Sequence, residues 1–278
     1  MAIVSFWSNI KKETAQTLSV VAIATHMAIE HNSKILILDT NFDNPTINNC
    51  FFKNGFTPTF KTGRVDLGSG VTGLTKLITS GKINPESITD YTKVILSNSR
   101  LELLINVSPE NQLEAEKVKA GFLELVKMAG MYYDYVFVDL QKGLDEPFVR
   151  DVLQNSDVIV TYITQRMRDL DEFNLLRQSD DLCKSDKVFP LIGRYERFSK
   201  YTKKNVAKYL RFRREFSAVP YNTLFFEAAS EGMVLDYFMR FKRNLIDSSD
   251  RNAAFIQEIE NTAENLIMRI RETQMRRY

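Results

Sequence analysis

The segment SNIKKETAQT, residues 8–17, holds the first residues of this chain whose types and spacing could do chemistry. It joins a short apolar run to a helix-period stretch, and at such junctions many α/β proteins bind a phosphate with backbone N–H groups and the helix dipole. The segment contains no glycine, however, and it places the carboxylate of Glu13 in the loop. Taken alone, it is typical of a polar loop in which a Ser or Thr caps the following helix.

A second candidate for chemistry is the basic segment at 194–215, RYERFSKYTKKNVAKYLRFRRE. Its nine Lys and Arg residues and two Glu residues give it a net charge of +7, whereas the whole chain carries only +2. This charge, interleaved with Tyr and Phe, favours binding to DNA phosphates. The residues that we expect to contact DNA are Lys203, Lys204, Lys208, Arg211, Arg213 and Arg214. A solvated helix face with inward-packed aromatics, an acidic protein partner and the chain's own acidic surface would explain the same pattern.

Other motifs carry less chemistry. GSGVTG at 68–73 matches the glycine pattern of dinucleotide-binding loops, but the stretch before it is too polar for the buried strand that such a loop needs. We expect a loop closed by a helix start there.

We expect structural roles for His26 and His31, because no Ser or Cys nucleophile has a recognisable partner constellation. Cys50 and Cys183 match no metal or redox spacing, which favours a reducing compartment.

The elements that must position these residues follow from the apolar pattern. Short apolar runs alternate with helix-period stretches, as in parallel strands joined by crossover helices. The expected strands are 2–7, 34–39, 101–107, 135–140, 157–163, 187–193 and 217–221. The expected helices are about 15–31, 110–129, 145–154, 168–182, 202–211 and 223–231, with a last one near 249–275. The pattern predicts a three-layer α/β sandwich with a mostly parallel sheet and an irregular excursion near 53–100.

Composition points to a cytoplasmic protein. The 278 residues are 44% hydrophobic, and no apolar run approaches the roughly 18–20 residues that span a bilayer. The first residues lack the features of a signal peptide.

The last helix carries an apolar stripe, which predicts packing on the domain or on a partner helix. That stripe consists of Phe255, Ile259, Ala263, Leu266 and Ile270. Its basic end leaves membrane docking as an alternative, which its glutamates disfavour.

The chain resembles the ParA/MinD family of deviant-Walker P-loop ATPases, which also contains the TadZ/CpaE-like localisation proteins. Five segments carry the resemblance, in the family's order, at 4–24, 34–47, 133–149, 188–202 and 219–238. Together they cover nearly the whole chain. The resemblance implies a single domain over 1–278 with a P-loop NTPase-like central sheet.

In that family, the first strand leads into a loop of the form GKGGxGKTT, whose N–H groups close around phosphates. Aligned without a gap, this chain replaces the glycines with Asn9, Lys11, Lys12 and Thr14. Ile10 replaces the lysine that reaches across a nucleotide-bound dimer, and Ala15 the lysine that holds the terminal phosphates. Gln16 replaces the hydroxyl residue that coordinates magnesium, and Thr17 is retained. Each missing charge-assisted hydrogen bond would remove about 1.5 to 3 kcal/mol of phosphate binding.

The strand ends show the same partial match. Asp39 matches the family's aspartate associated with magnesium, and Asp139 matches the Walker B aspartate. Asn41 stands in place of the aspartate that orients the attacking water, for which Asp43 could substitute. Gly193 stands where the family often has the Asn that reads adenine. Asp39 and Asp139 could equally be strand-end carboxylates that cap the turns after them.

These substitutions imply a ParA/MinD-like pseudo-ATPase that acts as a positioning, partition or assembly factor through protein contacts, with DNA binding as an addition. We expect a homodimer, no membrane role and no bound cofactor. One alternative is a weak Mg²⁺-dependent ATPase in which Lys11 or Lys12 replaces the missing ammonium group. Thr17, Asp39 and Asp139 would then hold ATP and Mg²⁺. A nonenzymatic DNA-binding module is the third hypothesis.

Overall fold

A central sheet of eight strands runs through the molecule in the order β3-β4-β2-β5-β1-β6-β7-β8. The structure is a computed structural model that describes residues 1–10, 13–42, 46–53, 70–79, 81, 84–98, 100–105, 111–141, 143–212, 216–242 and 250–276. The strands are β1 (Ala2–Trp7), β2 (Ile35–Asp39), β3 (Thr92–Leu96), β4 (Leu101–Leu104), β5 (Tyr135–Leu140), β6 (Val158–Ile163), β7 (Val188–Tyr195) and β8 (Ser217–Pro220). All neighbours pair in parallel except β3 and β4.

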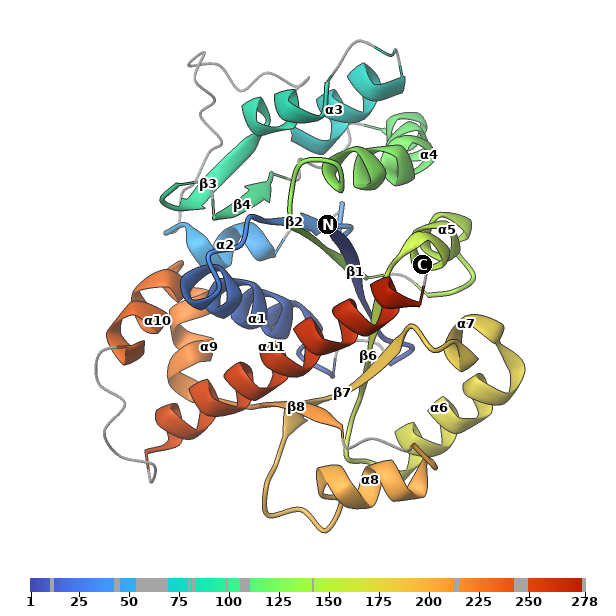
Figure 1. The fold of residues 1–278 in the computed structure, drawn as a ribbon, viewed down its shortest axis with the longest axis vertical. Coiled ribbons are helices and arrows are strands. Elements are labelled where there is room, and N and C mark those ends of the chain that lie inside the picture. Colours follow the sequence, from blue (N-terminus) through green and yellow to red (C-terminus); the bar gives the residue numbers. More distant parts are fainter. Residues whose placement is uncertain are drawn as a thin grey trace.

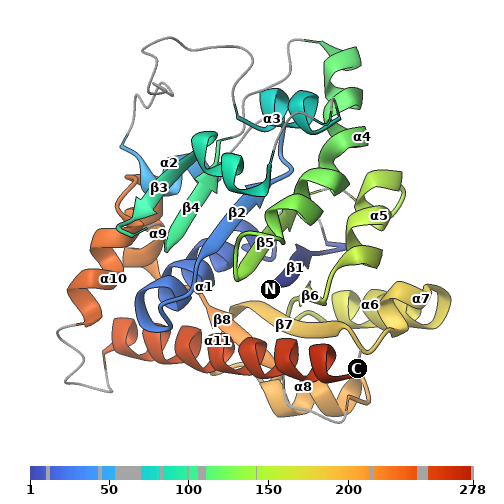
Figure 2. The ribbon, with the colours of Figure 1, turned by 45° about the horizontal axis from the view of Figure 1, so that its top comes forward.

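Helices cover both faces of this sheet (Figures 1 and 2). One face packs against α1 (Gln16–Glu30), α2 (Ile47–Phe51), α9 (Thr223–Ser230), α10 (Val234–Lys242) and α11 (Arg251–Met275). The other packs against α3 (Gly70–Thr79), α4 (Gln112–Ala129), α5 (Pro147–Asn155), α6 (Met167–Ser179), α7 (Asp181–Lys184) and α8 (Lys203–Tyr209). A 3₁₀ helix, η1 (Pro85–Asp90), precedes β3. The three-layer α/β sandwich that the sequence predicts is therefore confirmed.

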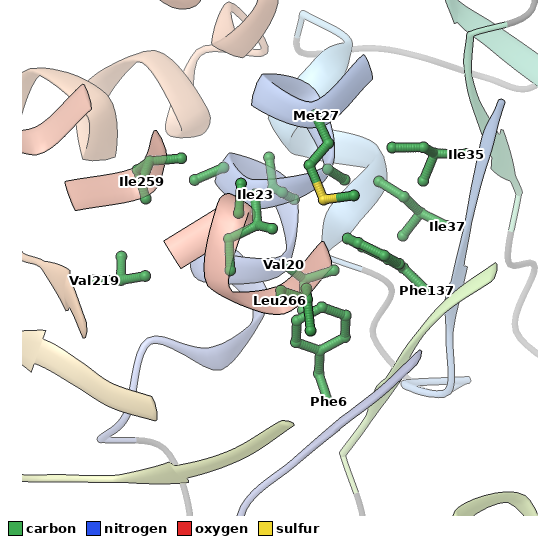
Figure 3. Packing of buried hydrophobic residues seen from close by; sticks show 14 of the residues in the cluster. Phe6, Val20, Ile23, Met27, Ile35, Ile37, Phe137, Val219, Ile259 and Leu266 are labelled. Carbon is green, nitrogen blue, oxygen red and sulfur yellow. The ribbon is translucent and has the colours of Figure 1, made fainter. Parts of the chain in front are cut away.

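The strands are apolar at every position because both of their faces are buried. Along β2, Ile35 and Ile37 belong to the core under α1, whereas Leu36 and Leu38 belong to the core under α4. Figure 3 shows the first of these cores, in which side chains of α1 and α11 pack together against the strands. This packing fixes the start of α1 relative to the strand ends.

All seven expected strands are present, although the one expected at 101–107 ends at Leu104. Within 53–100, where the sequence predicts an irregular excursion, the described residues contain α3, η1 and β3. The edge strand β3 is only half-buried, so it lacks the continuous apolar run of the other strands. The helix start expected at GSGVTG is present, and α3 already begins at Gly70.

One predicted helix needs correction, and two helices were not predicted. The helix expected at 168–182 divides at Asp180, whose backbone is extended and whose side chain accepts a hydrogen bond from the N–H of Leu182. Both α2 and α10 were missed, since one is very short and the other follows α9 after only a brief turn.

The apolar stripe of α11 is buried against the domain, as its spacing predicts. No helix in the described ranges is long and apolar enough to cross a membrane.

Candidate functional site

The candidate site lies at the carboxyl ends of β1, β2 and β5. β1 is central: strands β2 to β5 lie on one side of it, and β6 to β8 lie on the other. Such a switch point leaves a crevice outside the strand ends, where α/β proteins bind ligands. Asp139 pairs in register with Phe6 on β1 and with Asp39 on β2. The sheet therefore brings Asp39, Asp139 and the loop after β1 together.

The carboxylate of Asp139 is fully buried and is hydrogen-bonded by three side chains. The amide of Gln16 donates through Nε2 to Oδ1 over 2.5 Å, and the hydroxyl of Thr17 donates to Oδ2 over 2.7 Å. The amide of Gln141 also donates to Oδ2 over 2.7 Å, and to the hydroxyl of Thr17 over 2.9 Å. Both oxygens of Asp139 are thus occupied by donors from the chain itself.

The orientation of the Gln16 amide is fixed by backbone groups. Its Nε2 also donates to the carbonyl oxygens of Phe6 and Leu140, over 3.0 and 2.9 Å. Since a carbonyl oxygen can only accept, the amide must present nitrogen to this pocket. An amide nitrogen is a donor and cannot replace a hydroxyl oxygen as a ligand of Mg²⁺, which takes oxygen ligands.

Burial gives Asp39 an unusual protonation state. Desolvation, reinforced by the nearby Asp139 carboxylate, raises the pKa of Asp39 to about 8. Burial also raises the pKa of Asp139, while hydrogen bonds from Thr17, Gln16 and Gln141 favour its ionised form. Two adjacent carboxylates in a low-dielectric site do not both ionise readily. Asp39 therefore keeps its proton to a higher pH than an ordinary aspartate does.

Ala15 occupies the position at which α1 begins. Its backbone is left-handed, with φ of 52° and ψ of 36°, and its side chain makes no cap hydrogen bond. Its carbonyl oxygen accepts hydrogen bonds from the N–H and the hydroxyl of Ser19. A methyl group here offers a phosphate neither charge nor a donor. The left-handed conformation costs a non-glycine residue about 1 to 2 kcal/mol.

Glu13 is engaged by a residue outside the loop. Its carboxylate forms an ion pair with the guanidinium of Arg166, which precedes α6, and both side chains are about half exposed. Arg166 also contacts the buried carboxylate of Asp169 over 2.8 Å. Asp169 in turn accepts a hydrogen bond from the hydroxyl of Thr164. This chain of contacts ties the loop after β1 to the end of β6.

The same loop lies directly against β7. A Cβ atom placed on Gly193 would come within 2.0 Å of the carbonyl oxygen of Thr14, and within 3.3 Å of the ring of Tyr162. The hydroxyl of Ser8 donates to the carbonyl oxygen of Tyr162 over 3.3 Å. The backbone at Thr14 thus fills the space that a larger side chain at position 193 would need.

The structure brings together three of the residues expected from the sequence: Thr17, Asp39 and Asp139. Lys11, Lys12 and Asp43 lie outside the described residues. The sequence analysis missed Gln141 and Arg166. Gln141 could have been found, since it follows Asp139 by two residues at a strand end. Nothing in the sequence pattern indicates the pairing of Arg166 with Glu13, which is formed between separate loops.

The basic segment is only partly free. Lys203 is half-buried and pairs with Glu258 of α11 over 3.0 Å. Lys204, Lys208 and Arg211 are exposed, and Arg213 and Arg214 lie outside the described residues. Of its aromatic residues, Tyr195, Tyr201 and Phe212 pack against the core between α6 and α8. Phe198 and Tyr209 are exposed. The alternative in which the aromatics pack inward thus holds for three of the five.

Comparison with solved structures decides the fold. Neither the family models nor the curated protein sequences gave a match. A ParA family ATPase from Chlorobium tepidum superposes with a TM-score of 0.67 and 15% identity, over 92% of this chain and 95% of that one. MinD from Pyrococcus horikoshii, complexed with Mg-ADP, gives 0.63 and 14%, over 95% of each chain. The fold is that of ParA and MinD.

A third structure of this fold is a putative plasmid partition protein from Borrelia burgdorferi bound to AMPPNP. It superposes with a TM-score of 0.57 and 17% identity, over 100% of this chain and 99% of that one. Nucleotides thus bind to solved proteins with the ParA/MinD fold.

The described residues of this chain do not fit Mg²⁺ and a nucleotide. In the ParA/MinD resemblance, Asp139 faces a cation, yet here Gln16, Thr17 and Gln141 occupy both of its oxygens. Gln16 presents nitrogen, Ala15 presents a methyl group, and Thr14 closes against Gly193. The arrangement stabilises a buried carboxylate, and we derive no catalytic step from it.

Proposed function

We propose that this chain uses the ParA/MinD fold as a nucleotide-independent positioning, partition or assembly factor, and that it acts through protein contacts. One observation supports this most strongly: hydrogen bonds from the chain itself satisfy the buried Asp139 carboxylate. Replacing them with a cation would leave the Gln16 amide buried beside a positive charge. The loss of a hydrogen bond to a charged group costs about 1.5 to 3 kcal/mol.

Self-association is part of this proposal. A homodimer is what the resemblance suggests, but Ile10 supplies no charge to reach across a nucleotide. Copies of the chain would therefore associate without a nucleotide trigger. Partners other than a second copy would also bind the surface of the folded chain directly.

The test is nucleotide binding by the purified chain, measured by calorimetric titration with ATP or ADP and Mg²⁺. We expect no binding at concentrations up to about 1 mM, which corresponds to less than about 4 kcal/mol of binding free energy. The weak-ATPase alternative predicts micromolar binding that Lys11→Ala or Lys12→Ala abolishes. Lys204→Ala, at an exposed lysine of α8, is the matched control. Micromolar binding by the parent chain would overturn the proposal.

A second candidate function is DNA binding without sequence preference. Lys204, Lys208 and Arg211 favour it, because these exposed cations lie on or directly after one helix. Such a surface can neutralise phosphates without reading bases. Salt-dependent binding that is the same for unrelated DNA sequences would support this function.

A further inference from the structure

An acidic groove with an apolar floor lies between α4 and α5. Its volume is about 420 Å³, within the range of pockets that take an organic group. The floor is formed by Ala120, Leu123, Pro147 and Phe148. The ring of Phe148 is well supported, because it packs against Phe42 and Phe122 with centroid distances of 6.3 Å each. None of the floor residues belongs to the strand-end site.

The rim of the groove is negatively charged. Four carboxylates line it, from Glu116, Glu124, Glu146 and Asp151, against the single ammonium group of Lys119. Lys119 is engaged by Glu146 over 3.2 Å and lies 5.6 Å from the ring centre of Phe148. Glu124 forms a surface pair with Lys127, a contact worth little in water. Within the described ranges, Glu116 and Asp151 form no ion pair, so the rim attracts a cation.

The turn at 196–201 presents the complementary shape. Phe198 is 82% exposed, and the cations of Arg197 and Lys200 flank it along the chain. The guanidinium of Arg197 lies 4.8 Å from the centre of the Phe198 ring. Neither Arg197 nor Lys200 has a carboxylate partner in the part of the chain that the structure describes. An apolar ring between unpaired cations matches an apolar floor inside an acidic rim.

This turn is held in one conformation, which lowers the entropy lost on binding. The side chain of Gln165 accepts a hydrogen bond from the N–H of Glu196 over 2.7 Å. It donates to the carbonyl oxygens of Glu196 and Tyr201, over 3.0 and 2.7 Å. The N–H of Phe198 donates to the carboxylate of Glu196 over 3.1 Å. The exposed ring thus projects from a braced turn.

We propose that copies of this chain associate head to tail, with Phe198 of one copy inserted into the groove between α4 and α5 of the next. The turn leads directly into α8, and both views place α8 at the opposite end of the molecule from α4 (Figures 1 and 2). A pair of copies joined in this way keeps one turn and one groove free for further neighbours. A contact between two different surfaces builds rings or open chains of copies rather than a pair joined through identical surfaces. This inference rests on the self-association in the proposed function, for which it names the surfaces.

Sedimentation velocity on the full chain tests it, at about 5 to 200 μM protein and about 50 mM salt. We expect the average mass to keep rising with concentration beyond a dimer, and to fall in about 500 mM salt. Phe198→Ala should weaken association at least about tenfold, as truncating a central aromatic anchor does. Leu175→Ala, at another exposed apolar residue, is the control and should have no effect.

Charge reversal makes the test specific. Glu116→Lys with Asp151→Lys reverses the rim, and Arg197→Glu with Lys200→Glu reverses the turn. Neither double variant should associate alone, because like charges then meet, but an equimolar mixture should assemble. Glu227→Lys with Glu231→Lys adds the same charge on or just after α9 and should leave association of the parent chain unchanged. Circular dichroism confirms folding of each variant.

Three outcomes would overturn the inference. These are a monomer throughout the concentration range, a dimer that does not grow further, and a mixture of reversed variants that stays unassociated. A closed dimer that ignores the Glu116 and Asp151 changes would leave self-association intact while excluding this contact. The failure of the inference is therefore distinguishable from failure of the proposed function.

Discussion

At the scale of single residues, the most informative group is the carboxylate of Asp139. Buried charges are tolerated when several hydrogen bonds compensate for the missing hydration. Here Gln16, Thr17 and Gln141 supply them from two segments of the chain. Position 16, where the resemblance places a magnesium ligand, here supplies a hydrogen-bond donor to this acid.

Gln16→Met tests the value of these hydrogen bonds, since it keeps an unbranched side chain of similar length and removes the donors. We expect a loss of about 2 to 4 kcal/mol in the free energy of unfolding, because a buried carboxylate loses a partner and two carbonyls lose theirs. Urea denaturation measures it. Gln154→Met, at an exposed position of α5, should change stability by less than about 0.5 kcal/mol.

Asp39→Asn tests the protonation of the acid pair. Asp39 has a folded-state pKa of about 8, against an ordinary value of 3.8, so the folded chain retains a proton that the unfolded chain releases. The parent chain therefore loses stability as pH rises from about 4 to 8. Asn cannot ionise, so this loss should disappear.

Urea unfolding of both chains at pH 5, 7 and 8.5 measures the effect. Relative to the parent, Asp39→Asn should gain about 1 to 3 kcal/mol between pH 5 and 8.5. The exposed Asp236→Asn should follow the parent at every pH. A constant difference between Asp39→Asn and the parent would show that Asp39 ionises normally.

At the scale of elements, the loop after β1 is shaped by the strands around it. It lies between the ends of β5, β6 and β7, and the carbonyl oxygen of Thr14 touches Gly193. Arg166, just before α6, also pairs with Glu13 of this loop. The loop packs as part of the core, so a substitution in β7 should act on it.

Gly193→Asn restores the residue that the resemblance places there. Because its Cβ would lie 2.0 Å from the Thr14 oxygen, the loop must move, at a cost of about 1 to 3 kcal/mol. Thermal unfolding measures the cost, and hydrogen exchange of residues 13–17 should accelerate. Gly81→Asn is the control, since Gly81 has open space and a left-handed φ that Asn tolerates. Equal protection of the loop in variant and parent would contradict the close contact.

At the scale of the whole molecule, charge is distributed unevenly. The basic segment at 194–215 has a net charge of +7, whereas the whole chain has only +2, so the rest of the chain is net acidic. Part of this negative charge lines the groove between α4 and α5. This polarity favours partners with oriented charge, whether DNA phosphates or another copy of the chain.

The DNA hypothesis makes a quantitative prediction about salt. Replacing Lys204, Lys208 and Arg211 together with Ala should weaken binding to all DNA sequences alike. The slope of log K against log salt should fall by about 2 to 3, because each phosphate that the protein no longer neutralises reduces the slope by about 0.9. Fluorescence anisotropy with two unrelated duplexes measures it. Lys53→Ala with Lys117→Ala, at exposed lysines outside the basic segment, should leave the slope unchanged. An unaltered slope in the triple variant would exclude this surface.

The sequence by itself determined the sheet, because strands buried on both faces must be apolar throughout, and β2 and β5 show that pattern directly. It also placed Asp39, Asp139 and Thr17 at strand and helix ends that a parallel sheet brings together. The half-buried β3 gave no such signal.

Only the tertiary structure decided what the strand-end residues do. Whether Gln16 faces a cation or a carboxylate depends on the depth at which α1 packs, and the contact of Thr14 with Gly193 joins residues far apart in the chain. The pairing of Glu13 with Arg166 likewise depends on the approach of two separate loops. Hydrogen bonds and close contacts act over about 3 Å, so a pattern that locates elements only to within a few residues does not determine them.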